Sequence, residues 1–128
     1  MSTKYQDLTP EQFKAFVALP TEGPYQMLNL LKFKEHVEAS GVSGKEHYKT
    51  YMKAVVPFFE KANAKVLYSG KANFSLIGPS DGEEWDKVLI IEYDKKSDFL
   101  DMITAEGYPA KIRRQAIEDS RLIFCSPG

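Results

Sequence analysis

Hydrophobic residues occupy both faces of the segment 25–34, which reads Tyr-Gln-Met-Leu-Asn-Leu-Leu-Lys-Phe-Lys. Successive side chains of a strand point to opposite faces, so Leu28 and Leu30 share one face and Met27 and Leu31 share the other. A strand that is apolar on both faces is typical of a sheet interior that is covered twice. The pattern therefore predicts a central strand with one polar residue, Asn29, in its middle.

Three further segments have strand patterns. Residues 85–93 are again apolar on both faces and predict a second central strand. Residues 65–77 have one polar face and a bulge candidate at Gly70, which favours an edge strand that ends at a turn over residues 78–82. Residues 120–125 alternate and predict a short last strand.

Four segments have helical patterns. Residues 9–19 begin with Thr9, a capping residue, and Pro10. Residues 43–62 begin at Ser43, carry apolar residues at helical spacing and contain a kinking proline, Pro57, before a left-handed terminator at Asn63. We expect the third helix over 97–107, capped by Ser97, and the fourth from 109 to 119.

Without the first helix, the predicted order is strand, helix, strand, strand, helix, strand. This is the βαββαβ order of the ferredoxin-like fold, an α+β antiparallel sheet with its helices on one face. In that fold the first and third strands are central, and these are the two strands that are apolar on both faces here. We predict one domain over 1–128, with an N-terminal helical extension at 1–24 and the core at 25–124.

The second face of such a sheet has no helix to cover it, although Leu28, Leu30, Val88 and Ile90 would lie there. A large apolar surface of this kind normally marks an interface. A homodimer that packs sheet on sheet is the simplest solution. The alternative is that the helix at 9–19 covers part of this face.

Composition excludes several classes of partner. The chain has a net charge of −1 and no large basic cluster, so neither nucleic acid nor an anionic membrane is an expected partner. The polar N-terminus does not resemble a signal peptide, and no apolar run is long enough to span a membrane. One cysteine, Cys125, excludes an internal disulfide, which favours a cytoplasmic location.

Short matches in order resemble the uncharacterised domain-of-unknown-function family 1330. They are Met-Leu-Asn-Leu-Leu-Lys-Phe at 27–33, Tyr48-x-x-Tyr51 with Val-Pro at 56–57, Ala-Lys-Val-Leu at 64–67, Trp-Asp at 85–86, Tyr108, and Ala-Ile-Glu-Asp-Ser-Arg at 116–121. The resemblance implies a dimeric α+β barrel. Relatives in that superfamily include cofactor-free monooxygenases, lactone isomerases, haem-dependent enzymes and plain ligand-binding modules, and their ligands usually bind between the sheet and the helices.

Two residues are candidates for substrate binding by their position. Asn29 is a polar amide in an apolar strand and either orients a ligand or bonds to neighbouring protein groups. Arg113 precedes two apolar residues at helical spacing, so it lies on the inner helix face. Its guanidinium suits a carboxylate ligand, and the alternatives are a tip in water or an ion pair.

Other candidates cluster near the second helix. His47 and Tyr51 are candidates for proton transfer, although His47 also fits a surface position in the first turn. Tyr48 and Tyr108 are candidates for pocket lining, as is Tyr68, although core packing explains such tyrosines equally well. His36 and His47 are too few for a metal site, so we expect neither metal nor cofactor.

Two functions from different classes remain open. The first is a small cofactor-free enzyme acting on a small organic acid or aromatic in a pocket between sheet and helices. The second is a non-catalytic dimer that binds a small ligand or has a structural role. Glu118 and Asp119 are expected at a helix C-terminus, where negative charge is unfavourable. We expect an ion pair with Lys32, Arg113 or Arg121 to offset this cost, so neither carboxylate is assigned a role in either function.

Overall fold

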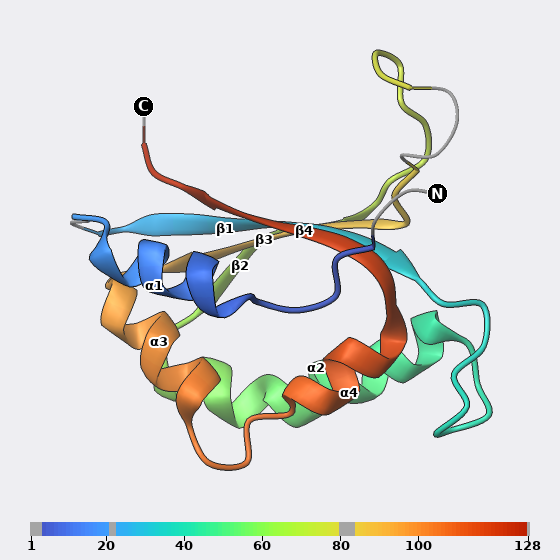
Figure 1. Ribbon diagram of the computed structural model, residues 1–128, viewed down its shortest axis with the longest axis horizontal. Helices are drawn as coiled ribbons and strands as arrows, with labels where there is room; N and C mark the ends of the chain where they lie inside the picture. Colours follow the sequence, from blue (N-terminus) through green and yellow to red (C-terminus); the bar gives the residue numbers. More distant parts are fainter. Residues whose placement is uncertain (1–3, 21–22, 80–83, 128) are drawn as a thin grey trace.

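The computed structural model describes residues 4–20, 23–79 and 84–127. Its element order contains the predicted βαββαβ core, with one helix before it and two helices in place of the second (Figure 1). The elements are α1 (Pro10–Ala18), β1 (Tyr25–Phe33), α2 (Gly44–Lys61), β2 (Lys65–Lys71), β3 (Lys87–Tyr93), α3 (Lys96–Thr104), α4 (Ala110–Ala116) and β4 (Ile117–Cys125).

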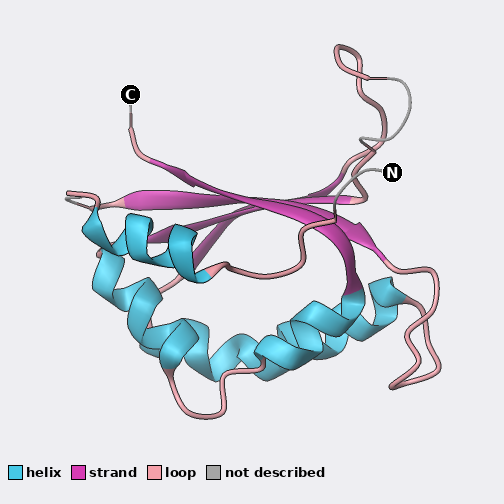
Figure 2. Cartoon of the chain, in the orientation of Figure 1, coloured by secondary structure: helices cyan, strands magenta, loops and turns pink. Residues whose placement is uncertain are grey.

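The four strands form one antiparallel sheet in the order β2-β3-β1-β4. The prediction that the first and third strands are central is confirmed. Along β1 every second side chain from Tyr25 to Leu31 is buried, and those between are only partly buried. The sheet and the helices form two layers, as Figure 2 shows, so the buried side of β1 faces the helices.

The predicted helix signals at α1 and α2 are confirmed. The Thr9 hydroxyl accepts a hydrogen bond from the backbone N–H of Gln12, and the Ser43 hydroxyl accepts one from Glu46. Both bonds satisfy amide groups that have no partner within the helix. Asn63, after α2, has a φ of 54° and so takes the left-handed conformation expected of a terminator.

Two predicted boundaries around α3 and α4 are wrong. Ser97 lies inside α3, and the N-cap position belongs to Lys95, whose side chain makes no capping bond. Residues 117–119 are strand and not the end of a helix, because Ile117 and Asp119 pair with the last residues of β1. Bonds between strands replace the last helical turn, so the helix-dipole argument about Asp119 does not apply.

The edge strand is shorter than predicted. β2 ends at Lys71, and the register shift lies between Val66 and Tyr68, not at Gly70. Residues 72–79 then leave the sheet on the side away from the helices (Figure 1). Phe74 and Ile77 in this segment are 85% and 95% exposed, so none of the described elements covers them. The predicted turn over 78–82 lies partly outside the described residues.

All four helices lie on the same side of the sheet (Figure 1). The alternative in which the first helix covers the second face is therefore wrong, because α1 packs through Phe16 against Phe99 of α3 and Phe124 of β4. We name the uncovered side the open face. It carries partly or largely exposed apolar side chains of three strands: Leu28, Leu30, Val88, Ile90 and Ile123.

Candidate functional site

A pocket of about 930 Å³ lies between the sheet and the helices. Its size falls within the usual range for small-molecule sites, which is about 300–1,000 Å³. Apolar side chains of β1, β3 and α3, including Met27, Leu89 and Phe99, form much of its wall. Polar groups gather at the part of the wall where β1 faces α2 and α4, and all the described helices contribute to the lining.

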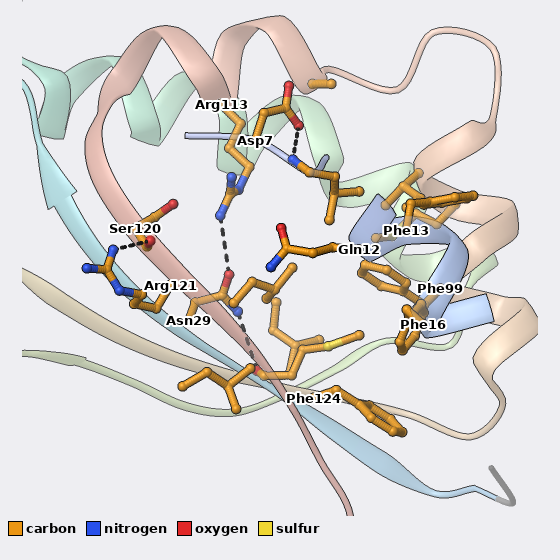
Figure 3. Close-up of a pocket in the computed structure, with 18 of the residues that line it drawn as sticks. Asp7, Gln12, Phe13, Phe16, Asn29, Phe99, Arg113, Ser120, Arg121 and Phe124 are labelled. Carbon is orange, nitrogen blue, oxygen red and sulfur yellow. Dashed lines mark hydrogen bonds between the residues drawn. The ribbon is translucent and has the colours of Figure 1, made fainter. Parts of the chain in front are cut away.

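Two arginines line this pocket: Arg121 of β4, which forms an ion pair with Asp119, and Arg113 of α4. One guanidinium nitrogen of Arg113, Nη2, lies 3.5 Å from the Asn29 side-chain oxygen, to which it donates a long hydrogen bond (Figure 3). The Asn29 amide nitrogen donates to the carbonyl oxygens of Met27 at 3.4 Å and Leu89 at 3.3 Å. Asn29 is therefore held by the two central strands and in turn orients the Arg113 guanidinium over the apolar wall.

Besides the exposed Tyr5, four tyrosines line the same pocket. The hydroxyls of Tyr51 and Tyr108 lie 2.7 Å apart and share a hydrogen bond. Burial raises the pKa of Tyr51, and the neighbouring Tyr108 raises it further. Burial also raises the pKa of Tyr48 to about 12, although the charge of Arg113 acts against this shift. All of these phenols are neutral near pH 7, so they donate hydrogen bonds and cannot act as bases.

The fourth tyrosine, Tyr93 of β3, was missed by sequence reasoning. It is 2% exposed and lines the pocket, yet its hydroxyl bonds to none of the described residues. Burial raises its pKa, and the phenols of Tyr108, Tyr25 and Tyr48 raise it further. Tyr68, the candidate named in its place, is 53% exposed on the edge strand and does not line the pocket. The two-sided apolar pattern of β3 was the signal that its last residue points inward.

His47 does not belong to this pocket. It is buried near the start of α2, with Nδ1 2.8 Å from the Ser40 hydroxyl and Nε2 3.0 Å from the Gln115 side-chain oxygen. Both ring nitrogens are thus occupied by a loop residue and a residue of α4. The structure brings Asn29, Tyr48, Tyr51, Tyr108 and Arg113 together and leaves His47 apart from them.

The carboxylates near the pocket are already paired. Asp7 at its rim lies 2.8 Å from Arg114, and Asp119 lies 2.9 Å from Arg121. Burial alone would raise the pKa of Asp119, but bonds from the Tyr5 amide and from Arg121 outweigh it and lower this pKa. Within the described ranges, no group of three or more metal-binding side chains exists and no helix is long and apolar enough to cross a membrane.

The N-terminal segment forms one wall of the pocket. Residues 5–8 and one side of α1, including Gln12, Phe13 and Phe16, line it. In Figure 3 the Gln12 side chain points from α1 into the pocket, on the side where Arg113 and Asn29 meet. The sequence predicted this helix but gave no sign that it would close a pocket, because its apolar residues are few.

A solved structure matches the chain over almost its whole length. It is the RPA0582 protein of Rhodopseudomonas palustris, described as a protein of unknown function, with 40% identity, a TM-score of 0.91 and 98% of each chain covered. The chain belongs to the family of this protein. The methylated RPA0582 protein matches equally well, with 38% identity, a TM-score of 0.91, and 99% of this chain and 97% of that chain covered.

A more distant structure shares the fold. A protein of unknown function from Bacteroides fragilis, described as dimeric and of ferredoxin-like fold, has a TM-score of 0.53 and 18% identity, with 84% of this chain and 100% of that chain covered. This likeness supports the predicted fold class and nothing finer. No protein-family model matches the chain, and a search of curated proteins finds no match either.

Proposed function

We propose that the pocket binds a small organic acid with an apolar body. The observation that carries this proposal is the Arg113 guanidinium, which faces the pocket without an ion pair to any described carboxylate. Arg113 is partly buried, and a charged group that is partly withdrawn from water favours a charged or strongly hydrogen-bonding partner. The long hydrogen bond that Arg113 donates to the Asn29 side-chain oxygen is a weak one, so a ligand carboxylate would complete the site.

The remaining polar groups fit the same ligand. Tyr93 offers a buried hydroxyl without a described partner, and buried polar groups in proteins are almost always hydrogen-bonded. Neutral phenols and a guanidinium are all donors, which is the set that the oxygens of an acid need. Met27, Leu89 and Phe99 would take up the apolar body.

The lining favours binding over catalysis. Tyr51 and Tyr108 are neutral donors, and Asp7 is paired with Arg114, so no described lining residue is available as a base. The first sequence-based function, a cofactor-free enzyme, keeps one supporting observation: the Tyr51–Tyr108 pair beside Arg113 could stabilise an oxyanion formed on an acid substrate. In that case Tyr51→Phe would lower turnover about 100-fold or more while ligand binding changes much less. Equal losses in both would speak against a catalytic role.

The test of ligand binding compares Arg113→Met with Lys111→Met, an exposed residue of the same helix. Both variants remove one positive charge. The probes are benzoate and 4-biphenylcarboxylate, titrated by nuclear magnetic resonance. Arg113→Met should weaken binding of both probes about 10- to 100-fold, since hydrogen bonds to charged groups contribute about 1.5–3 kcal/mol.

The control, Lys111→Met, should bind both probes as the wild type does. Mass spectrometry of the denatured wild-type protein should also detect a co-purified acid. The proposal is refuted if Arg113→Met binds the probes as tightly as Lys111→Met.

We further propose that the chain is a member of the domain-of-unknown-function family 1330, forms a homodimer and resides in the cytoplasm. The open face supports the dimer, because it leaves Leu28, Leu30, Val88 and Ile90 without cover. The Bacteroides fragilis protein of the same fold is described as dimeric. The single cysteine, Cys125, which is free, fits a reducing compartment.

The dimer has a direct test. Leu30→Lys places a charge in the middle of the open face and should convert the wild-type dimer to a monomer in sedimentation velocity experiments. Probe binding should persist, because Leu30 points away from the pocket. A wild-type protein that is monomeric at micromolar concentration would contradict the proposal.

A further inference from the structure

α1 is not packed like an element of the core. It has nine residues and none of them is buried. An isolated helix of this length is only marginally stable in water. The helix therefore depends on its attachment to the rest of the chain, and the places of attachment determine how it behaves.

The C-terminal end of α1 is held by one side chain. Lys96, at the start of α3, donates hydrogen bonds from its ammonium to the carbonyl oxygens of Phe16 at 3.2 Å, Val17 at 2.8 Å and Leu19. The last carbonyls of a helix lack the usual partner one turn on, and the negative end of the helix dipole favours a cation there. Of the three, the Phe16 carbonyl also accepts a hydrogen bond from the backbone N–H of Leu19 at 3.1 Å. The last turn of α1 has no basic residue of its own, so Lys96 supplies the charge from another element.

The other end is held by four polar contacts to α4 and β4, one of which is the hydrogen bond that the Gln6 side-chain amide donates to the Ile117 carbonyl at 3.1 Å. Asp7 pairs with Arg114 at 2.8 Å, the Tyr5 amide donates to Asp119 at 2.9 Å, and the Ser120 hydroxyl donates to the Tyr5 carbonyl at 2.7 Å. Between the two ends, α1 touches the molecule mainly through Phe16, which makes edge contacts with two rings. The segment 5–19 is thus attached to the rest of the chain by polar contacts at both ends, and few apolar side chains pack between them.

The side of α1 that faces the pocket has its own chemistry. Phe16 lies with Phe99 and Phe124 at the part of the pocket away from Arg113, and the Gln12 amide points toward the polar part (Figure 3). If the acid group of a ligand binds Arg113, the rest of the ligand extends along the apolar wall toward Phe16. Contact with Phe16 therefore requires a ligand with an apolar tail that extends well beyond its acid group.

We infer that α1 is a releasable wall, which means a side of the pocket that can detach from the rest of the chain, and that it selects the ligand. Phe16 contacts the apolar tail of an organic acid, and the ligand enters and leaves when the hydrogen bonds of Lys96 to the end of α1 break. This inference rests on the proposed binding function. The expected ligand is then an organic acid with an extended aromatic or branched tail. The segment before the ferredoxin-like core thereby also has a role.

The selection is tested with the two acids of different length. Phe16→Ala should weaken binding of 4-biphenylcarboxylate about 10-fold and change that of benzoate less than about 2-fold. Val17→Ala, on the exposed side of the same helix, is the matched control and should change neither. If Phe16→Ala affects both probes equally or neither, the selective role is refuted while the binding function stands.

Release is tested by hydrogen exchange, which needs no ligand. The control variant is Lys95→Met, at an exposed neighbouring position. Amide exchange in residues 10–18 should be about 10-fold faster in Lys96→Met than in Lys95→Met, and exchange in α2 should be the same in both. Lys96→Met should also speed dissociation of 4-biphenylcarboxylate. Asp7→Asn, which weakens the other end, provides a second variant should Lys96→Met fold poorly. Equal exchange in Lys96→Met, Asp7→Asn and Lys95→Met would overturn the releasable wall, whether or not a probe binds.

Discussion

The hydrogen bond between Tyr51 and Tyr108 allows a quantitative test of the pocket. At 2.7 Å it joins α2 to the loop before α4, and Tyr51 is only 4% exposed. Tyr108→Phe leaves the deeply buried Tyr51 hydroxyl without this partner, which costs about 2 kcal/mol. Tyr51→Phe leaves the less buried Tyr108 hydroxyl without its partner, and we expect the free energy of unfolding to fall by about 1 kcal/mol.

The double variant separates a shared bond from two independent effects. With both hydroxyls removed, no buried donor is left unpaired, so the loss should fall short of the sum by about 1 kcal/mol. In a domain of this size each kcal/mol corresponds to a shift of about 3–5 °C in melting temperature. Urea unfolding, followed by the fluorescence of Trp85 at fixed protein concentration, measures all four proteins of the cycle.

A control pair makes the outcome decisive. The Tyr25 hydroxyl donates to the Lys95 carbonyl at 3.1 Å and shares no partner with Tyr51. Tyr25→Phe combined with Tyr51→Phe should therefore be additive to within about 0.5 kcal/mol. If the Tyr51–Tyr108 pair is equally additive, the two hydroxyls are not coupled and the polar network of the pocket does not exist in solution.

Two further predictions concern stability. Since burial raises the pKa of Tyr48 from 10.0 to about 12, the folded state keeps its proton where the unfolded state loses it. The contribution of Tyr48 to stability should be constant below pH 10, fall as the pH rises from 10 to about 12 and be lost above that. Absorbance at 295 nm should show late tyrosine titration, and titration of all tyrosines near pH 10 in the folded protein would contradict this. Gly44→Ala should destabilise by about 2–4 kcal/mol, because a Cβ there would lie 2.5 Å from backbone atoms of two other segments. The control is Gly41→Ala, whose added Cβ would have no atom within 4 Å, so its cost is only the strain of a φ of +74°, about 1–2 kcal/mol. Equal losses of stability for the two variants in calorimetry would refute the packing argument.

The fold was largely predictable because its signals are local. Apolar residues on both faces of β1 and β3 predicted the central strands, and Thr9 and Ser43 predicted two helix starts. The errors occurred where contacts distant in sequence decide the outcome. Residues 117–119 have a helical pattern, yet they pair with the end of β1, and no local feature of Ile117 announces this partner.

The candidate site was predictable in part for the same reason. Asn29 and Arg113 stood out as polar groups in apolar elements, and the structure brings them to one pocket. His47 also stood out, but its partners Ser40 and Gln115 are fixed by a loop and by the packing of α4 on α2, which sequence spacing does not reveal. The wall formed by α1 depends on Lys96, a residue that looks like any exposed lysine.

The alternation along β1 assigns the two proposed functions to neighbouring residues. Asn29 points to the pocket and Leu30 to the open face, so one strand serves both surfaces. A one-residue shift in the register of β1 would exchange the two sets of side chains and destroy both surfaces at once. A substitution that respects the alternation should instead affect one surface alone. Arg113→Met and Leu30→Lys should therefore act independently, and a variant protein carrying both should be a folded monomer that binds the acid probes as weakly as Arg113→Met alone.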